Sequence, residues 1–208
     1  MIEGDDIYYN IAKTGKGQLR EKMSRFLAFA YKVKNSDEAR EYIRSIQNEY
    51  HDARHVCWAY ALGPDGGDWQ LNDNGEPSGT AGKPILGQIR SAGLTDVVVC
   101  VVRYFGGIKL GTSGLIQAYR ESARLALEDA GRMECYKSRT VEVSVGYVCL
   151  DGVMRIARLP GVEILSQEFD NVCRLVLNVR ESRFDEITGL LSKVEGAVIE
   201  SASDAPLL

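Results

Sequence analysis

The stretch that decides the fold runs over residues 96–115 and reads DVVVCVVRYFGGIKLGTSGL. Six consecutive apolar residues, Val97–Val102, form an unbroken run that is typical of a strand covered on both faces. Glycines follow, and the apolar spacing beyond them predicts a long helix that begins near Thr112 or Ser113 and ends near Gly131. The stretch therefore predicts a buried strand, a glycine-rich loop and a long helix that packs on the sheet.

The residues before this stretch predict an α/β layer around the buried strand. Alternating or continuous apolar patterns and turn residues predict the following elements: strands over residues 25–33, 55–62 and 68–71, a helix capped by Ser36, and a short helix with Pro84 in its first turn.

The last part of the chain, from residue 138 onward, has a separate pattern of predicted strands and helices. Its patterns predict, in order, a strand over 139–150, a helix over 151–159, a hairpin of 162–169 and 172–180, a helix capped by Ser182, and a short strand at 198–199. This β-α-β-β-α-β order is that of the ferredoxin-like fold. We therefore expect an α+β protein of two domains, residues 1–135 and 136–208.

Composition excludes several classes of protein. The 208 residues are 45% hydrophobic and 26% charged, which is ordinary globular usage and excludes disorder and collagen-like repeats. No apolar run approaches the ~20 residues of a membrane span, and the acidic start is unlike a secretory signal. The five scattered cysteines are typical of reduced thiols, so we expect a cytoplasmic protein without a membrane partner.

An excess of positive charge and a high density of glycine coincide in the middle of the chain. Residues 77–124 carry six basic and two acidic side chains, whereas residues 138–208 carry seven basic and eleven acidic ones. Residues 63–114 contain 12 of the 21 glycines, which permit positive φ angles and close backbone approach. A local positive excess beside shaped loops suggests phosphate or a nucleic-acid backbone as the partner.

A first candidate site is the loop of residues 73–86, DNGEPSGTAGKPIL. Its glycines can expose backbone N–H groups, and it ends at a helix N-terminus, where anions bind readily. The spacing does not match a Walker loop, and a plain series of turns with a helix cap is the alternative. Asp73 and Glu76 are candidates for magnesium ligands beside a phosphate, although Asp-Asn-Gly is also ordinary turn chemistry.

A second candidate site follows the buried strand. Arg103 and Lys109 are positioned to hold phosphate, and Tyr104 or Phe105 to stack on a base, but large aromatic residues more often belong to the core. Nearby, His55 and Cys57 share one face of a strand. Too few ligands accompany them to predict a metal site, and residues two apart on a strand seldom form the hydrogen bond that a nucleophile pair needs.

Both candidate loops, together with the RHVCWAY strand at residues 54–60, resemble the signature of the YigZ/IMPACT family in its bacterial two-domain form. The resemblance implies a first domain like domain two of a small-subunit ribosomal protein. It implies a second, ferredoxin-like domain similar to the last domain of elongation factor G. It also implies a link with the regulation of translation. Asn74, Ser113 and Gln117 depart from the usual aspartate, glycine and arginine of that signature.

Three functions follow as expectations. The first is a non-enzymatic factor that binds RNA or the ribosome. The alternative is an enzyme that binds a phosphorylated small molecule or nucleotide. The third is a structural protein whose second domain docks on another protein. No metal or other cofactor is expected, and the sequence does not fix an oligomeric state. The candidate phosphate-binding residues are Ser78, Thr80, Gly82, Lys83, Arg103, Tyr104, Gly106, Gly107, Lys109 and Gly111, and the candidate acidic or polar members are Asp73, Glu76, His55 and Cys57.

Overall fold

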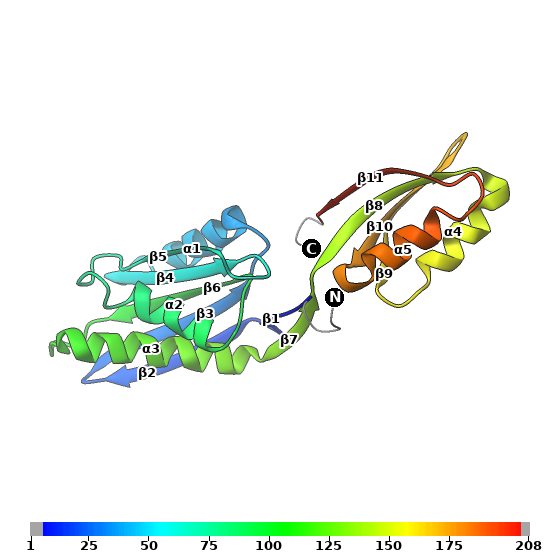
Figure 1. Cartoon of the computed structure of the whole chain (residues 1–208). Coiled ribbons are helices and arrows are strands. Elements are labelled where there is room, and N and C mark those ends of the chain that lie inside the picture. The colour runs from blue at the N-terminus through cyan, green and yellow to red at the C-terminus, as the bar shows by residue number, and fades with distance from the viewer. Residues whose placement is uncertain (1–5, 205–208) are drawn as a thin grey trace. The chain divides into compact units, whose positions relative to one another are not determined.

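The structure is a computed structural model that describes residues 6–204 (Figure 1). Contacts divide the chain into two compact units. One comprises residues 8–135, and the other comprises residues 136–204 together with residues 6 and 7. The chain is thus an α+β protein of two units, as the sequence predicts.

The first unit is built on a five-stranded sheet in the order β2-β3-β6-β4-β5, and every neighbouring pair is antiparallel. Its elements are β2 (Gly15–Glu21), β3 (Ser24–Lys32), α1 (Ser36–Glu49), β4 (His55–Leu62), β5 (Asp68–Asn72), α2 (Gly82–Ser91), β6 (Val97–Tyr104) and α3 (Gly111–Ala130). Because the sheet is antiparallel, the rule that places ligands at the carboxyl ends of parallel strands does not apply to β6.

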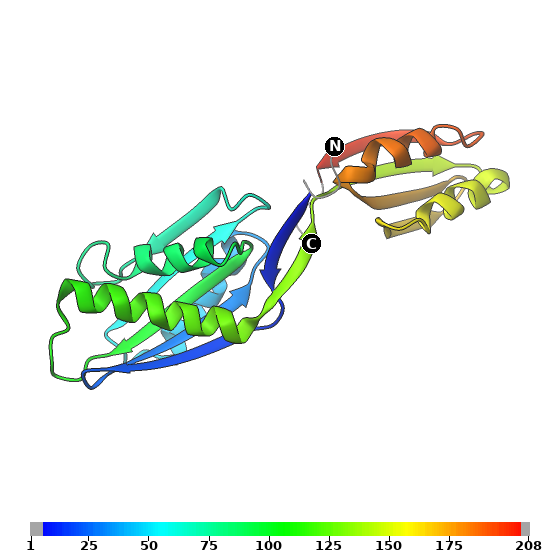
Figure 2. The same ribbon diagram turned by 60° about the horizontal axis from the view of Figure 1, so that its bottom comes forward.

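Two helical layers sandwich this sheet. Helices α2 and α3 pack on one face, and α1 packs on the other (Figures 1 and 2). Side chains alternate along β6, so that Val99 and Val101 enter the α2–α3 core while Val98 and Val102 enter the α1 core. All six residues of the apolar run are fully buried, which confirms that this strand is covered on both faces.

Three strands were not expected. β1 (Ile7–Ile11) and β7 (Arg132–Tyr136) pair as a two-stranded sheet, and β2 forms an edge of the large sheet. Glycines in β2 let α3 approach the strand closely: a Cβ on Gly15 would stand 2.0 Å from the carbonyl oxygen of Ala126. Helix α1 is capped by Asn35, whose side chain accepts from the backbone N–H of Glu38, so the expected Ser36 cap is wrong.

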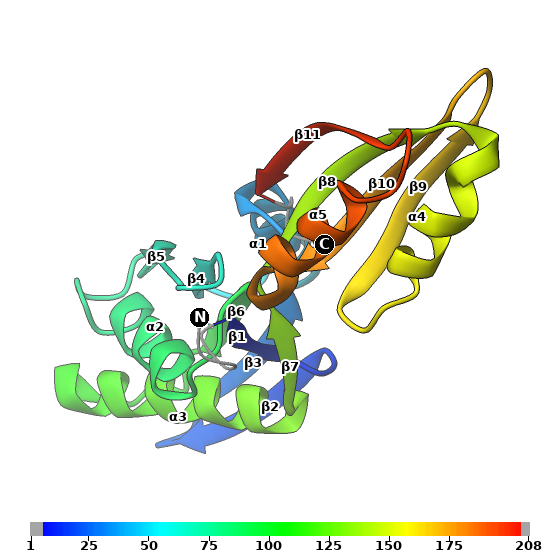
Figure 3. The same cartoon turned by 45° about the vertical axis from the view of Figure 1, so that its right-hand side comes forward.

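The second unit has a four-stranded antiparallel sheet in the order β11-β8-β10-β9. Its elements are β8 (Ser138–Val145), α4 (Leu150–Ala157), β9 (Val162–Phe169), β10 (Cys173–Arg180), α5 (Phe184–Leu191) and β11 (Val198–Asp204). This is the ferredoxin-like arrangement, with α4 and α5 packed on one face of the sheet (Figure 3).

The second unit departs from the sequence expectation in two places. β8 ends at Val145 rather than at Leu150, because a short 3-10 turn over Tyr147–Cys149 leads into α4. The expected Ser182 cap is also wrong, since α5 begins after a 3-10 turn and has no side-chain cap. Among residues 6–204, no helix has both the length and the apolar character that crossing a membrane requires.

Candidate nucleic-acid interface

The loop between β5 and α2 is organised by the carboxylate of Asp73. One carboxylate oxygen, Oδ1, accepts from the backbone N–H groups of Ala81 and Gly82 at 2.9 and 2.8 Å, and Oδ2 accepts from that of Gly79 at 2.8 Å. These are the main-chain donors that the sequence suggested for an external anion. A carboxylate of the chain itself occupies them and completes the N-terminus of α2, so the predicted phosphate cradle at this loop is internally filled.

Glu76 and Arg103 join the two candidate loops. Arg103 donates to Oε1 of Glu76 at 2.6 Å, and only 7% and 4% of the two side chains are exposed. The hydroxyl of Tyr119, from α3, donates to the same oxygen at 2.9 Å. The structure thus brings the two glycine-rich stretches together, but it places Arg103 inside their junction, where the guanidinium is not available to a phosphate.

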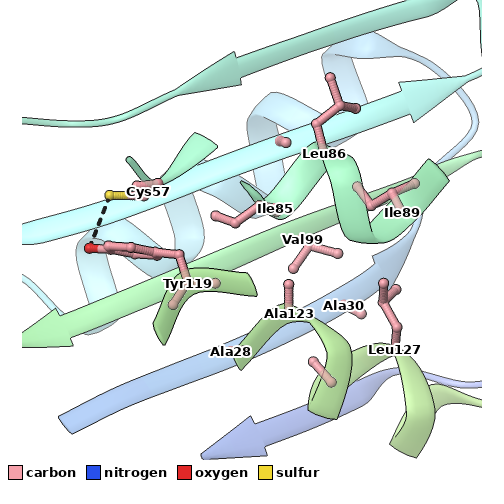
Figure 4. Close-up of a cluster of buried hydrophobic side chains, with 14 of the residues drawn as sticks. Ala28, Ala30, Cys57, Ile85, Leu86, Ile89, Val99, Tyr119, Ala123 and Leu127 are labelled. Atoms are coloured by element: carbon pink, nitrogen blue, oxygen red, sulfur yellow. Dashed lines mark hydrogen bonds between the residues drawn. The ribbon is translucent and has the colours of Figure 1, made fainter. Parts of the chain in front are cut away.

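Cys57 joins the same buried network through Tyr119, and Figure 4 shows the hydrogen bond between these two side chains. Its thiol donates to the carbonyl oxygen of Asp73 at 3.0 Å and lies 3.3 Å from the hydroxyl of Tyr119. Burial raises the pKa of this thiol to about 12, so the group is neutral at physiological pH. His55 contacts a different group: its Nδ1 donates to the carbonyl oxygen of Asn74 at 2.8 Å, since a carbonyl can only accept. The two side chains therefore form no nucleophile pair.

Arg103 and Tyr104 lie on opposite faces of the sheet, because consecutive residues of β6 alternate. Tyr104 packs with the α1 layer, and its hydroxyl donates to Oδ1 of Asp52 at 2.7 Å. Tyr104 therefore cannot share one pocket with Arg103. Phe105 is 47% exposed, so the expectation that this ring belongs to the core is wrong.

The glycines of the second loop have different roles. Gly106 packs against the turn between β2 and β3, where an added Cβ would stand 2.1 Å from the carbonyl carbon of Met23. By contrast, Gly107 and Gly111 have φ angles of 87° and 72° and open space around them. Lys109 is exposed between them. The loop is fixed at its start and open near the beginning of α3.

A groove between α2 and α3 is the strongest candidate for an interface. It measures about 720 Å³ and is lined by basic residues from both helices, without a carboxylate among the residues that form it. Its cations are Lys83, Arg90 and Arg120, all exposed. Within residues 6–204, neither Lys83 nor Arg120 has an ion-pair or hydrogen-bond partner.

Only one of the three groove cations is a candidate site residue from the sequence alone. The sequence makes Lys83 a candidate, whereas Arg90 and Arg120 are only two of the six basic residues of the stretch 77–124. The spacing of Lys83 and Arg90, seven residues or two helical turns apart, was the signal that places both on one face of a helix. Of the remaining candidates, Ser78 is exposed, and the hydroxyl of Thr80 donates to the carbonyl oxygen of Pro77 at 2.6 Å.

The carboxylates near the groove are already engaged. Asp73 accepts three backbone N–H groups, and Glu76 accepts from Arg103 and Tyr119. Among the residues that the structure describes, no three His, Cys, Asp or Glu side chains are grouped as they would be around a metal ion. Neither carboxylate is presented as a free base or ligand.

Comparison with known proteins identifies relatives along most of the chain. Residues 22–127 match the Impact N-terminal domain. The chain is 38% identical to YvyE of Bacillus subtilis over 69% of this chain and 66% of that protein, and 35% identical to an IMPACT family member of Haemophilus influenzae over 83% and 84%. It is 42% identical to YigZ of Escherichia coli over 51% of this chain and 53% of that protein, so the alignments with YvyE and YigZ span less than two thirds of those relatives.

Solved structures extend the likeness to both units. A crystal structure of a hypothetical protein superposes with a TM-score of 0.73 at 27% identity, and the match covers 96% of this chain and 98% of the other. The matched domain covers half of the chain, and the Haemophilus relative is aligned over more than two thirds of its length. The chain therefore belongs to the IMPACT family.

Proposed function

We propose that this chain is a non-enzymatic RNA-binding factor, linked with translation, that holds RNA phosphates in the groove between α2 and α3. One observation carries the proposal: three exposed cations from two helices, Lys83, Arg90 and Arg120, line one groove without a carboxylate. Clustered unpaired cations are the electrostatic footprint of a phosphate backbone. The role in translation that the family resemblance implies would bring the chain to ribosomal RNA.

The second unit differs from the first in its charge. Residues 138–208 carry seven basic and eleven acidic side chains, so charge does not favour the binding of nucleic acid there. The proposed RNA contact is accordingly confined to the first unit. The alternative, an enzyme acting on a phosphorylated small molecule, would need Asp73 or Glu76 as a base or magnesium ligand. Both carboxylates already hold internal partners.

Binding of a labelled RNA tests the proposal. The probe is a fluorescein-labelled RNA hairpin with a single-stranded tail of about 12 nucleotides, read by fluorescence anisotropy. The test variant carries Lys83→Gln, Arg90→Gln and Arg120→Gln. Loss of three phosphate contacts is expected to weaken binding about 100-fold at about 0.1 M salt, because each contact contributes a factor of about 5 under these conditions.

A matched control separates position from net charge. Lys32, Lys34 and Arg44 are exposed; Lys32 ends β3, Lys34 lies between β3 and α1, and Arg44 lies on α1. Replacing all three by Gln removes the same charge from other parts of the unit and is expected to weaken binding only slightly. Equal losses in the two triple variants would contradict a specific role for the groove.

A further inference from the structure

We infer that the RNA bound by this chain is single-stranded and that two of its unpaired bases stack on the rings of Trp69 and Phe105. The inference rests on the proposed function, because it assumes that phosphates lie in the α2–α3 groove. The two rings are 44% and 47% exposed, and each is backed by an arginine guanidinium.

Trp69 flanks the groove from the edge strand β5. It pairs with Ala61, whose side chain faces the α2–α3 core, so the indole lies on the same side of the sheet as α2. The guanidinium of Arg90 lies over this indole, 4.8 Å from the ring centroid, and Arg90 itself lines the groove. One side chain therefore contacts both the exposed ring and the space proposed for phosphates.

Phe105 is held in a similar way near the other end of β6. The guanidinium of Arg103 lies 5.5 Å from the centroid of its ring and the same distance from that of Phe26, which is fully buried. Because Glu76 fixes Arg103, the ring of Phe105 rests on a rigid support and leaves part of its surface to solvent. A ring that is fixed before binding loses little entropy when a base stacks on it.

The two rings stand far enough apart to serve one extended strand. Trp69 lies in the row of Ala61 and Val97, whereas Arg103, the support of Phe105, lies six residues further along β6. At about 3.3 Å per residue, the two rows are about 20 Å apart along the strand. A strand that extends from the groove along the direction of β6 would meet the two rings with bases several nucleotides apart.

This arrangement favours single-stranded over double-stranded RNA. In a duplex, the faces of the bases are covered by their neighbours, and A-form RNA is recognised mainly by its shape and its backbone. Proteins that bind single strands combine a basic groove with exposed aromatic rings on which bases stack. Cations alone would suit either form of RNA; the two supported rings, Trp69 against the groove cation Arg90 and Phe105 beyond the end of β6, fit unpaired bases.

The test compares variants that remove each ring with variants that remove a comparable ring elsewhere. Trp69→Leu and Phe105→Leu are the test variants, and Tyr42→Leu and Phe169→Leu are the controls. Tyr42 is 36% exposed in the α1 layer, and Phe169 is 51% exposed in the second unit. The probes are oligouridine of about 12 nucleotides, an abasic strand of the same length, and an RNA duplex.

Each test variant is expected to weaken oligouridine binding about 5- to 150-fold, with the salt dependence unchanged. Binding of the abasic strand and of the duplex should not change, and Trp69→Phe and Phe105→Tyr should restore oligouridine binding because they keep a ring. If oligouridine binds the Leu variants and the parent chain equally, the stacking inference is wrong while the proposed function stands. If no RNA probe binds the parent chain, the proposed function itself fails.

Discussion

Glu76 and Arg103 form a buried ion pair, 2.6 Å from Nη1 to Oε1, between the β5–α2 loop and the end of β6, 27 positions apart in the chain. The pair fixes the start of the second glycine-rich loop against the first. A buried pair of this kind is costly to break, because removing one charge leaves the other without compensation in a medium of low polarity.

Glu76→Gln is therefore expected to lower the free energy of unfolding by about 3–5 kcal/mol. The amide keeps a hydrogen-bond acceptor for Tyr119 but leaves the guanidinium of Arg103 unpaired. Urea denaturation followed by the fluorescence of the two tryptophans measures the change. The double variant Glu76→Gln with Arg103→Leu should lose less than the sum of its single changes, and strict additivity would argue against the pair.

Asp73 gives a different prediction, because its carboxylate occupies backbone donors that otherwise attract anions. Asp73→Ala frees the N–H groups of Gly79, Ala81 and Gly82, which should cost about 1–2 kcal/mol of stability. The vacated site should then bind sulfate. Thermal unfolding in sulfate and in chloride, at equal ionic strength, should show a larger sulfate stabilisation for the variant than for the parent chain; equal responses would count against the site.

Gly106 is required by a close approach of main chain rather than by its φ angle. A Cβ at this position would lie 2.1 Å from the carbonyl carbon of Met23 and 2.5 Å from the backbone nitrogen of Ser24, so Gly106→Ala should displace the loop and destabilise the first unit. Gly87→Ala is the matched control. Gly87 lies inside α2 with open space around it, and alanine there should stabilise the helix by about 0.5–1 kcal/mol. Chemical denaturation should show a lower free energy of unfolding for Gly106→Ala and a higher one for Gly87→Ala.

Cys57 should react as a buried structural thiol. Because burial raises its pKa to about 12, almost no thiolate is present at pH 8, and alkylation requires the thiolate. Labelling with iodoacetamide, followed by peptide mass spectrometry, should modify Cys57 far more slowly than the partly exposed Cys149, at a rate that rises with added urea. Rapid labelling of Cys57 in the folded chain would instead support a nucleophile.

The second unit should lose stability in acid through Asp6. Hydrogen bonds from Arg180 hold the pKa of this carboxyl well below its usual value of about 3.9. A lowered pKa stabilises the fold above the unfolded value, and the stabilisation is lost as the pH falls below about 4 toward the folded value. The protection of β8 and β10 against hydrogen exchange, expressed relative to the intrinsic rate at each pH, should fall at low pH in the parent chain, and Asp6→Asn should show reduced protection already at pH 7.

Much of the fold could be predicted because its signals are local. Val97–Val102 identifies a strand covered on both faces, and the alternation and turns of the tail identify the ferredoxin-like order. β2 was missed because its sequence, GKGQLRE, is rich in glycine and charge, and only the packing of α3 explains those glycines. The Asn35 cap was missed because Ser36, next to it, is an equally good capping residue.

The site was harder to predict because its contacts are tertiary. Asp73 looks the same in sequence whether its carboxylate binds a metal or fills a ring of backbone donors. Arg103 looks like a phosphate ligand until its partner, 27 residues earlier in the chain, is known. Arg90 and Arg120 lie on separate helices, and their convergence on one groove depends on how α2 packs against α3.

The salt dependence of RNA affinity tests the central claim most directly, since it counts the phosphates that the protein neutralises. The logarithm of the association constant is plotted against the logarithm of the salt concentration for the parent chain and for the variant with Lys83, Arg90 and Arg120 changed to Gln. The magnitude of the slope should fall by about 2, because each lost contact to a single strand removes about 0.7. Identical slopes for the two proteins would show that RNA does not lie in the α2–α3 groove.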